Sequence, residues 1–334
     1  MPAPKGPHLL CLAPLPGRLS HALAECFICH TTLNDGEENS IRGLVGSGNA
    51  LYRESLLDIL PNLEIISVFG TGYEGVPVDY CRSRGIRVTH TPDVLTEDMA
   101  DVALALVLMT SRRLLEANRF LHDGGWPAMS FPLGFKPGGK RAGIFGLGRV
   151  GQAVARRLEA LGMRVGYAAR RPNLTVSYPF FRSLHDLAFW SDFLIIACPG
   201  GSATRHLVDT SVLEMLGPDG TLINITRGSV VDEAALVHAL ETGTIRAAGL
   251  DVYEREPLVP DQLTRLPQVV LLPHVGSRTE ENREEMARMV HDNLIAYFQG
   301  QPLLNVIPEL RTTTQRRLES VTLFSSPPPV AAAK

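Results

Sequence analysis

Short apolar runs alternate with amphipathic stretches along the first ninety residues of the chain. Runs of four or five residues, the length of short buried strands, occupy 9–13, 27–31, 43–46, 65–69 and 86–90. Strands separated by helical stretches predict a parallel sheet with helices on both faces. The first part of the chain is therefore expected to form an α/β domain.

The same alternation begins again at residue 141. Its apolar runs read RAGIFG, RVGYA, DFLIIACP, GTLINIT, AAGLDV and VVLLPH. Six strands in this order predict one complete doubly wound unit. Between the two series we expect a long helix that starts near Thr96, with Thr96 as its cap and Glu97 and Asp98 in an acidic first turn, and that runs past Arg113.

After the second series, the stretch 279–298 has helical periodicity and precedes Gly300, a residue type that favours helix ends. Because it follows a finished domain, we expect this helix to return to the first domain, with 302–308 packing beside it. Residues from 309 onward are left as a tail. Its last part, 317–334, is rich in proline and is expected to be flexible.

Composition and charge narrow the classes of partner. The chain of 334 residues is 45% hydrophobic, and 32 basic against 35 acidic residues give a net charge of −3. This balance gives no global attraction to nucleic acid or to an anionic membrane. No window is long and apolar enough for a membrane span, and the first residues make a poor secretory signal. A cytoplasmic protein without nucleic-acid or membrane partners is expected.

One cysteine spacing raises a different possibility. Cys26-Phe27-Ile28-Cys29-His30 matches the attachment pattern of c-type haem, which would require export. The odd total of five cysteines indicates reduced thiols rather than a disulfide framework. We favour the simpler interpretation, a strand over 27–31 that follows a short helix.

A glycine loop provides the first functional motif. Gly146-Leu147-Gly148-Arg149-Val150-Gly151 directly follows an apolar strand and precedes the helical stretch 152–161. Its three glycines permit a tight turn, close approach of a pyrophosphate and close packing of the helix on the strand. The helix N-terminus adds unpaired amides that favour an anion. This arrangement predicts a dinucleotide site.

The end of the next strand distinguishes the two nicotinamide nucleotides. An NAD site usually has an acidic residue about twenty residues after the glycines, but no carboxylate occurs between Glu159 and Asp186. The strand instead ends Ala169-Arg170-Arg171, and guanidinium groups suit a 2′-phosphate. The sequence thus predicts NADPH in preference to NADH. A solvated arginine pair outside the adenosine site remains the alternative.

Three charged or titratable residues follow successive apolar strands of the second series: Arg227, Glu256 and His274. In an open α/β sheet, ligands bind at the carboxyl ends of the strands. Reduction of a 2-oxo acid requires a cation for the substrate, a proton donor and a group that keeps the donor protonated. Each residue alone is typical of a surface or core position, but the three together predict a catalytic site.

These motifs resemble the D-isomer-specific 2-hydroxyacid dehydrogenase family, especially its glyoxylate and hydroxypyruvate reductases. The matching segments cover most of residues 64–307; they are GIFGLGRVGQAVARRLEALG, ACPGGSATRHLVD, INITRGSVVDEAALVHAL, GLDVYEREP and LLPHVGS. The resemblance implies two Rossmann-like or flavodoxin-like domains with parallel sheets and an active site in the cleft between them. Residues 1–100 and 289–316 would bind the substrate, residues 101–288 would bind NADP, and two chains would form a homodimer around the cofactor domains.

The resemblance also implies individual roles. Arg227 would hold the substrate carboxylate and carbonyl, His274 would donate the proton, and Glu256 would favour the charged imidazole. The loop Gly70-Thr71-Gly72 corresponds to the family's substrate loop, with a plain turn as the alternative. Further cofactor contacts are implied for Cys198, Pro199, Thr204, Thr226, Asp251 and Gly276, and Trp126 is a candidate for closing over the substrate.

Two other functions share parts of this pattern. An NAD-dependent D-2-hydroxyacid dehydrogenase of different substrate preference is one, although such members place an aspartate near Ala169. The other is a dinucleotide sensor similar to the C-terminal binding proteins, which share the fold and the triad but bind NAD. The sequence does not distinguish between close 2-oxo acids, because small apolar pockets discriminate weakly.

Overall fold

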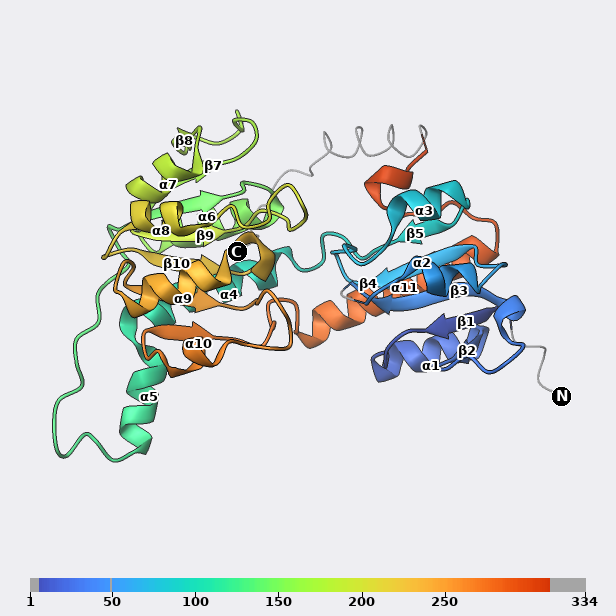
Figure 1. Cartoon of the computed structure of the whole chain (residues 1–334), viewed down its shortest axis with the longest axis horizontal. Helices are drawn as coiled ribbons and strands as arrows, with labels where there is room; N and C mark the ends of the chain where they lie inside the picture. The colour runs from blue at the N-terminus through green and yellow to red at the C-terminus, as the bar shows by residue number, and fades with distance from the viewer. Residues whose placement is uncertain (1–5, 49, 313–334) are drawn as a thin grey trace, which may run out of the picture. The chain divides into compact units, whose positions relative to one another are not determined.

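The chain folds into two compact units, and the first of them is made of two separate segments of the sequence. The computed structural model describes residues 6–48 and 50–312, of which 6–94 and 280–312 form the first unit and 95–279 the second (Figure 1). The boundaries between the units, after residues 94 and 279, lie earlier in the sequence than the expected boundaries at 100 and 289. The reason is that α4 (Thr96–Arg112) packs on the sheet of the second unit, whereas α11 (Glu280–Phe298) packs on that of the first.

The first unit contains a five-stranded parallel sheet in the order β2-β1-β3-β4-β5. This is the flavodoxin-like order, in which the chain reverses direction across the sheet at β1. Each predicted apolar run of the first series overlaps one strand. The strands are β1 (His8–Cys11), β2 (Ile28–His30), β3 (Ile41–Ser47), β4 (Ile65–Phe69) and β5 (Arg87–Thr89).

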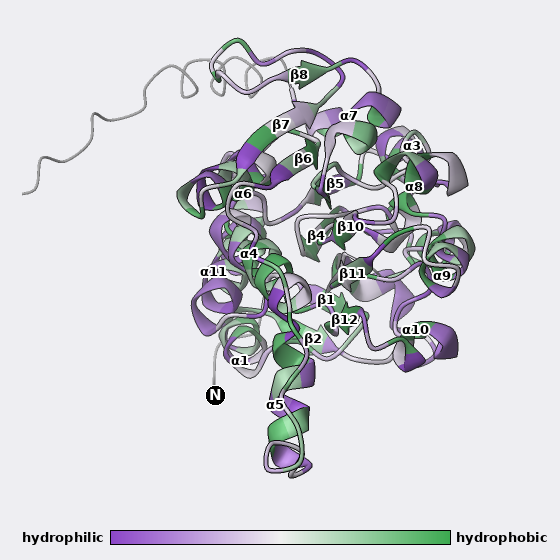
Figure 2. Cartoon of the chain, turned by 90° about the vertical axis from the view of Figure 1, so that its left-hand side faces the viewer, coloured by the Kyte–Doolittle hydropathy of each residue, from purple (hydrophilic) through white to green (hydrophobic). Residues whose placement is uncertain are grey.

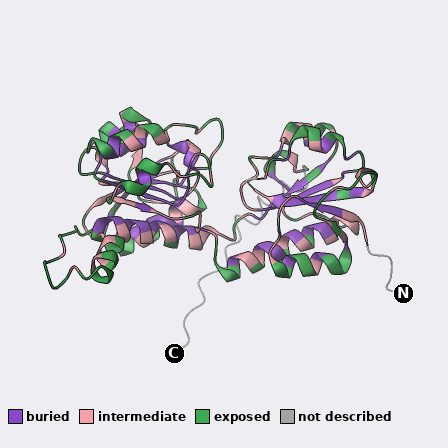
Figure 3. Cartoon of the chain, turned by 60° about the horizontal axis from the view of Figure 1, so that its bottom comes forward, coloured by how far each residue is buried: buried purple, intermediate pink, exposed green. Residues whose placement is uncertain are grey.

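Helices cover both faces of this sheet. On one face Leu23 of α1 (Gly17–Cys26) and Val290 of α11 pack against Leu9 and Ile65, which are fully buried. On the other face lie α2 (Glu54–Asp58) and α3 (Val78–Ser83). Figure 3 shows buried residues on the strands and on the sheet-facing sides of the helices. Two apolar cores therefore hold the first unit, one on each side of its sheet.

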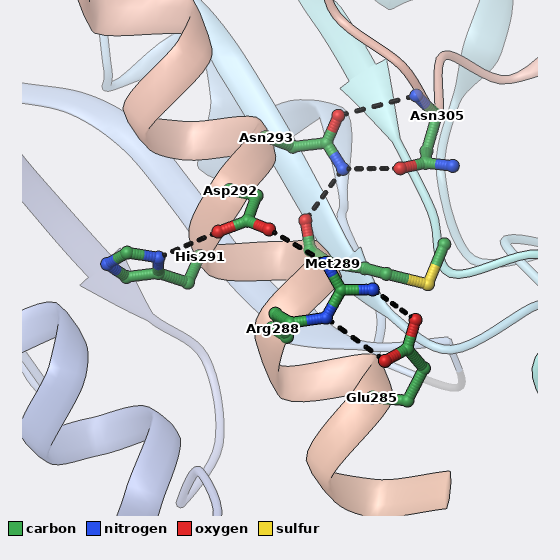
Figure 4. Close-up of polar contacts among 7 residues, drawn as sticks. All are labelled: Glu285, Arg288, Met289, His291, Asp292, Asn293 and Asn305. Atoms are coloured by element: carbon green, nitrogen blue, oxygen red, sulfur yellow. Dashed lines mark hydrogen bonds and ion pairs between the residues drawn. The ribbon is translucent and has the colours of Figure 1, made fainter.

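The segment after α11 returns to the edge of this sheet, as expected. The Asn293 side-chain amide donates to Asn305 Oδ1 at 3.0 Å, while Asn293 Oδ1 accepts from the Asn305 backbone amide at 3.4 Å (Figure 4). Val306 then forms an antiparallel bridge with Thr89 of β5. Helix α11 also carries an exposed ion pair, Arg288 with Glu285, on its outer side.

The beginning of the predicted tail is part of the fold. Pro308–Leu310 forms a 3-10 turn, and the Tyr73 hydroxyl donates to the Glu309 carboxylate at 3.0 Å. The expectation that the chain is a tail from 309 onward was therefore wrong for its first residues, because this turn gains a partner from another element. The segment 317–334, predicted to be flexible, lies outside the described residues.

The second unit contains a seven-stranded parallel sheet in the order β12-β11-β10-β9-β6-β7-β8. Counted from β6, this is the Rossmann order, and the order reverses at β6. All six predicted strands are present; they are β6 (Arg141–Phe145), β7 (Arg164–Ala168), β9 (Phe193–Ile196), β10 (Thr221–Asn224), β11 (Ala247–Leu250) and β12 (Val269–Leu271). The seventh, β8 (Phe180–Phe181), was not predicted, because two residues give no hydrophobic pattern.

Two layers of helices bury this sheet. One face is covered by α4 and α6 (Arg149–Ala160), and the other by α7 (Leu184–Trp190), α8 (Thr210–Leu216) and α9 (Glu233–Glu241), with α10 (Asp261–Arg265) beside β12. In Figure 2 hydrophobic colours gather on the strands, whereas α10 shows hydrophilic colours on its outer side. No helix in the described part of the chain is long and apolar enough to cross a membrane.

Helix α4 differs from its prediction at both ends. Its first residue is Thr96, but the Thr96 side chain caps nothing, and the preceding Leu95 occupies the N-cap position without a side-chain hydrogen bond. At its C-terminus Arg113 adopts a left-handed conformation with φ of 53°, and a new helix, α5 (Leu114–His122), begins. The Arg113 side chain pairs with Glu116 at the start of α5. The apolar periodicity continues through this break and does not reveal it.

The Cys26–His30 segment has an ordinary structural role. It forms the end of α1 and the strand β2, which confirms the strand interpretation. His30 Nε2 lies 2.9 Å from His8 Nδ1, and His30 Nδ1 lies 3.3 Å from Glu37. Both ring nitrogens thus have partners within the unit. Across the described residues, no cluster of three or more His, Cys, Asp or Glu side chains could hold a metal ion.

Candidate active site

The glycine loop after β6 has the shape that its sequence predicts. Gly146 has a φ of 103°, and a Cβ atom there would lie 2.6 Å from the backbone nitrogen of Cys198. A Cβ on Gly151 would clash with the carbonyl oxygen of Gly146. Gly146 therefore provides the tight turn, and Gly151 allows α6 to pack closely on it.

Gly148 differs from the other two glycines because the space beside it is open. No atom lies within 4 Å of the position that its Cβ would take, and it is the residue that precedes α6. The first backbone amides of a helix have no partner within the helix, so they favour an anion at this point. The loop thus fits a pyrophosphate that approaches the backbone of Gly148.

The arginine pair lies at the end of β7. Arg170 and Arg171 are both exposed, and neither has a hydrogen bond or ion pair to another described residue. The chain just beyond them is held in place, because the buried Tyr167 hydroxyl accepts a hydrogen bond from the Asn173 amide at 2.8 Å. Two exposed guanidinium groups thus follow the strand after the glycine loop; this arrangement fits both an NADP site and a solvated pair, so their contact with a 2′-phosphate stays a prediction.

His274 and Glu256 form the central contact of the site. The strands β11 and β12 are adjacent and parallel, so the loops that follow them leave the sheet at the same edge. His274 Nδ1 lies 2.7 Å from Glu256 Oε2, and the two side chains are 33% and 23% exposed. Because an ionised carboxylate only accepts hydrogen bonds, Nδ1 carries a proton, and Nε2 is the nitrogen left for a substrate.

The electrostatic balance at Glu256 favours its ionised form. Burial acts to raise the pKa of Glu256, but His274, the backbone amide of Tyr253 and the positive charge of Arg227 outweigh it, so the pKa lies below its usual range. The Tyr253 amide donates to Glu256 Oε1 at 3.2 Å, which also orients the carboxylate. The carboxylate is therefore an anion that can stabilise a charged imidazole.

Arg227 is set by a tight turn at the end of β10. Asn224 organises this turn, because its side-chain amide donates to the Arg227 carbonyl at 3.0 Å and its Oδ1 accepts from the Thr226 backbone amide at 3.2 Å. The Arg227 stem packs on Gly200, where a Cβ would lie 2.6 Å from Arg227 Cγ. One of the guanidinium nitrogens donates to the Thr226 carbonyl at 2.7 Å.

Asp251 holds the segment that carries the histidine. It is completely buried, and its two carboxylate oxygens accept from the backbone amides of Val275 and Gly276 at 2.7 and 2.8 Å. Burial raises the pKa of Asp251, although these amides act in the opposite direction. His274 has a positive φ of 53°, and these bonds fasten the chain directly after it. The cofactor contact expected of Asp251 stays a prediction.

The remaining predicted cofactor residues lie in loops that leave the same edge of the sheet. Cys198 is buried beside Gly146, and burial raises the pKa of its thiol to about 12. The Thr204 hydroxyl donates to the Pro199 carbonyl at 2.8 Å, which folds this loop back on itself. The structure therefore collects the predicted cofactor residues at one edge of the sheet, while their contacts with a nucleotide stay predictions.

The predicted substrate loop lies in the first unit, after β4. Gly70 packs closely against Gly48, where a Cβ on Gly70 would lie 3.2 Å from the Gly48 nitrogen. The Thr71 hydroxyl donates to the Thr91 carbonyl at 2.7 Å, and the Thr91 amide donates to the Gly70 carbonyl at 3.0 Å. The loop is thus held by contacts with the segments around Gly48 and Thr91 of the same unit.

Several residues that organise these loops were not predicted. His90 is buried, and its Nδ1 lies 2.8 Å from the Thr71 carbonyl, so this contact fixes the position of the loop 70–72. Asn224 shapes the Arg227 turn, and the Tyr253 hydroxyl donates to the Leu272 carbonyl at 2.9 Å. Sequence position gives one signal for all three: each lies at or just after the end of a parallel strand.

A dinucleotide loop, a guanidinium group and an imidazole–carboxylate pair at one edge of a Rossmann sheet define a nicotinamide-nucleotide-dependent dehydrogenase. The model of the D-isomer-specific 2-hydroxyacid dehydrogenase NAD-binding domain matches residues 104–276, which lie within the second unit. The chain belongs to the D-isomer-specific 2-hydroxyacid dehydrogenase family. This confirms the resemblance seen in the sequence motifs.

Relatives and solved structures agree with this assignment. The chain is 47% identical over 271 residues to the hydroxyphenylpyruvate reductase of Plectranthus scutellarioides, covering 81% of this chain and 87% of that protein. It is 47% identical over 277 residues to glyoxylate/hydroxypyruvate reductase A of Arabidopsis thaliana, covering 83% and 88%. The solved NADPH-dependent glyoxylate/hydroxypyruvate reductase of Sinorhizobium meliloti, in complex with NADP and malonate, superposes with a TM-score of 0.87 at 42% identity, covering 91% and 98%.

Proposed function

We propose that this protein reduces the keto group of a small 2-oxo acid of the glyoxylate or hydroxypyruvate type to the D-2-hydroxy acid, with NADPH. The observation that carries the proposal is the 2.7 Å contact between His274 and Glu256, with Arg227 near enough to lower the pKa of that carboxyl. Family membership and the relatives named above support the same reaction.

Each of the three side chains has a defined part in this reaction. The Arg227 guanidinium binds the substrate carboxylate and carbonyl oxygen, because its planar donors suit both. When bound, NADPH supplies the hydride that reduces the carbonyl carbon. His274 donates a proton from Nε2 to the oxygen of the former carbonyl. Glu256, which stays ionised, stabilises the charged imidazole before this step and orients the ring through Nδ1.

The choice of NADPH rests on Arg170 and Arg171. Both are exposed at the end of β7 and have no partner among the described residues, so a 2′-phosphate would provide one. The open space at Gly148 would receive the pyrophosphate. The relative from Sinorhizobium meliloti with a TM-score of 0.87 is described as NADPH-dependent and binds NADP.

Steady-state kinetics with NADPH and NADH across glyoxylate, hydroxypyruvate, hydroxyphenylpyruvate and 2-ketogluconate tests this proposal directly. We expect turnover with small 2-oxo acids and a lower KM for NADPH. Substitution of both Arg170 and Arg171 by alanine should raise the KM for NADPH more than about 100-fold, because each of the two charged hydrogen bonds contributes about 1.5 to 3 kcal/mol, and should leave the KM for NADH almost unchanged. Equal losses for both nucleotides would contradict the phosphate role. Absence of turnover with either nucleotide would favour a dinucleotide sensor.

The substrate loop is also part of the proposal. The loop 70–72 would offer backbone amides to the substrate carboxylate. We assign the first unit to substrate and the second to NADP on the same grounds. Protection of loop 70–72 from amide hydrogen exchange, in the presence of both NADPH and a 2-oxo acid analogue, would support this arrangement. Unchanged exchange would count against it.

We further infer a homodimer built on the second unit. Helix α5 and the chain that follows it project from this unit (Figure 1), and they expose Leu121, Trp126, Met129 and Leu133 at 57%, 70%, 61% and 94%. Beside them lies a cavity of about 540 Å³ lined in part by Phe135 and Leu266. Exposed apolar surface of this kind favours association. Sedimentation of the purified protein should give twice the mass of the chain, and Leu133→Glu should lower the measured mass.

The expected cytoplasmic location also stays a prediction.

A further inference from the structure

A second carboxylate–imidazole pair lies next to the proposed catalytic pair. Glu254 Oε1 accepts from His206 Nε2 at 2.9 Å and from the Arg205 guanidinium at 2.6 Å. Burial acts to raise the pKa of Glu254, but these two partners outweigh it and leave the pKa below its usual range. Glu254 is therefore an anion, held by two donors, only two residues before Glu256.

His206 joins this carboxylate to the Arg227 turn. Its backbone amide donates to the carbonyl of Ser229 at 2.9 Å, in the 3-10 turn Gly228–Val230 that directly follows Arg227. It adopts a left-handed conformation with φ of 51°, which is unusual for a residue other than glycine. In this conformation its backbone binds one catalytic loop while its side chain binds the other, so the surrounding contacts hold a locally unfavourable geometry.

The two loops that His206 connects are also in direct contact. A Cβ atom on Gly228 would clash with the backbone of Tyr253 and Glu254, so the Arg227 turn lies directly against the chain that leads to Glu256. The Glu254 amide donates to the Glu233 carboxylate at 3.2 Å, which fastens the same chain to α9. A shift of Glu254 would therefore be transmitted both to the Arg227 turn and to Glu256.

We propose that Arg205, His206 and Glu254 form a positioning clamp that holds Arg227 and Glu256 in register for the reaction. The inference rests on the proposed function, because it assigns the clamp to the same site. None of the three is a proposed ligand of substrate or cofactor. Their effect is on geometry: Glu254 fixes the loop that carries Glu256, and His206 links that loop to the Arg227 turn.

A positioning role and a purely stabilising role predict different effects on the reaction rate and on folding. Glu254 and His206 are 20% and 34% exposed, and partly exposed ion pairs contribute little to folding. Small displacements of catalytic groups can lower rates about 100-fold. Removal of the clamp should therefore lower kcat strongly, while it changes the unfolding temperature only slightly.

Kinetics of four variants test the clamp in the full-length enzyme. We expect Glu254→Ala and His206→Leu to lower kcat for 2-oxo acid reduction about 10-fold, with a smaller change, within about 3-fold, in the Kd for NADPH, since the glycine loop and Arg170 lie elsewhere on the sheet and only Thr204 and Thr226 of the predicted cofactor residues adjoin the clamp. His206→Gln should restore most of the rate, because its amide can donate to Glu254 in place of Nε2. The double variant Glu254→Ala/His206→Leu should be no slower than either single one, because the residues act as a unit. Glu285→Ala, which removes an exposed ion pair of α11, is the control and should leave kcat unchanged.

Amide hydrogen exchange of the same variants gives a readout that does not depend on turnover. In Glu254→Ala, exchange should accelerate in the segments around 228–231 and 253–256 and stay unchanged at the glycine loop 146–151. Faster exchange in both segments together with unchanged kcat would overturn the positioning role, as would unchanged exchange in both. If the unsubstituted protein turns over no 2-oxo acid, the proposed function fails, while the exchange result still decides whether the clamp holds the two loops.

Discussion

The two units place a glycine loop after a central strand of a parallel sheet, yet the loops are held in different ways. In the second unit the loop after β6 leads at once into α6, and Gly146 and Gly151 allow backbone to pack on backbone. In the first unit the next helix after β4 begins only at Val78, and the loop 70–72 is held by the neighbouring side chain of His90. The loop after β6 thus depends on bare backbone, whereas the loop 70–72 combines close packing at Gly48 with hydrogen bonds from side chains.

This difference agrees with the two tasks that we propose for the loops. A pyrophosphate is a common, invariant part of the cofactor, and a helix N-terminus with bare backbone is sufficient to bind it. A substrate loop must instead fit one class of acid, so a side chain that adjusts the loop gives a means of tuning it. The proposed proton donor His274 and its carboxylate partner Glu256 meet in the second unit.

The largest effect should come from the second unit. His274→Gln removes the proton donor, so kcat should fall about 100- to 10,000-fold, the range of general acid catalysis. The Kd for NADPH, measured by fluorescence titration, should not change. A variant that kept a tenth of the original kcat would show that the proton comes from another group.

Alanine substitutions in the two glycine loops compare the loops directly. Gly151→Ala introduces a methyl group against the carbonyl of Gly146 and should weaken NADPH binding more than about 100-fold, because α6 can no longer pack on the turn. Gly70→Ala meets Gly48 at 3.2 Å, so a small shift accommodates it, and the KM for the 2-oxo acid should rise only a few-fold. Circular dichroism of both variants provides the folding control. Similar losses in the two variants would remove the distinction between the loops.

His90 variants should sharpen the comparison from the side of the first unit. His90→Leu removes the hydrogen bond to the Thr71 carbonyl, so the KM for the 2-oxo acid should rise about 5- to 10-fold, corresponding to about 1 kcal/mol, with kcat nearly unchanged. His90→Asn can place an amide donor at the position of Nδ1 and should recover most of the affinity. A change in kcat rather than KM would place His90 in the chemistry instead of in the loop.

The smallest effect concerns stability and pH. Since the pKa of Glu256 is lowered in the folded protein, its ionised form stabilises the fold above the usual glutamate range, and this contribution is lost as pH falls through the lowered pKa. Glu256→Gln cannot titrate. The difference in free energy of unfolding between the unsubstituted protein and Glu256→Gln should therefore narrow between about pH 6 and about pH 3 in urea titrations. A widening difference would contradict the direction of the shift.

Sequence reasoning succeeded where burial produces a continuous apolar pattern. All strands of three or more residues were predicted, because strands in a parallel sheet are buried on both faces. It failed for β8, which has two residues, and for the end of α4, where Arg113 turns into a left-handed conformation without the glycine that usually marks one. The apolar pattern in the sequence continues past the Arg113 turn into Leu114 and Leu115, so it does not mark the break, and a two-residue strand is too short to give a pattern.

For the site, the proposed catalytic residues were predicted from the sequence, but the residues that hold their loops in place were not. Arg227, Glu256 and His274 follow strands of one parallel sheet, so topology alone brings them to one edge. Asn224, His90 and Glu254 act through partners that are distant in sequence, or through a backbone carbonyl that has no sequence signature. Polar supports of this kind depend on how loops approach one another, which an apolar pattern does not record.

The order of the units along the chain has a consequence for synthesis. The second unit is complete when residue 279 has left the ribosome, but the first unit waits for α11, which covers the face of its sheet that includes Leu9 and Ile65. The nucleotide-binding half can therefore fold while the half that begins earlier still exposes an apolar face. Release of a nascent chain directly after residue 279 should yield a unit able to retain NADPH, attached to a segment that still exposes an apolar sheet face.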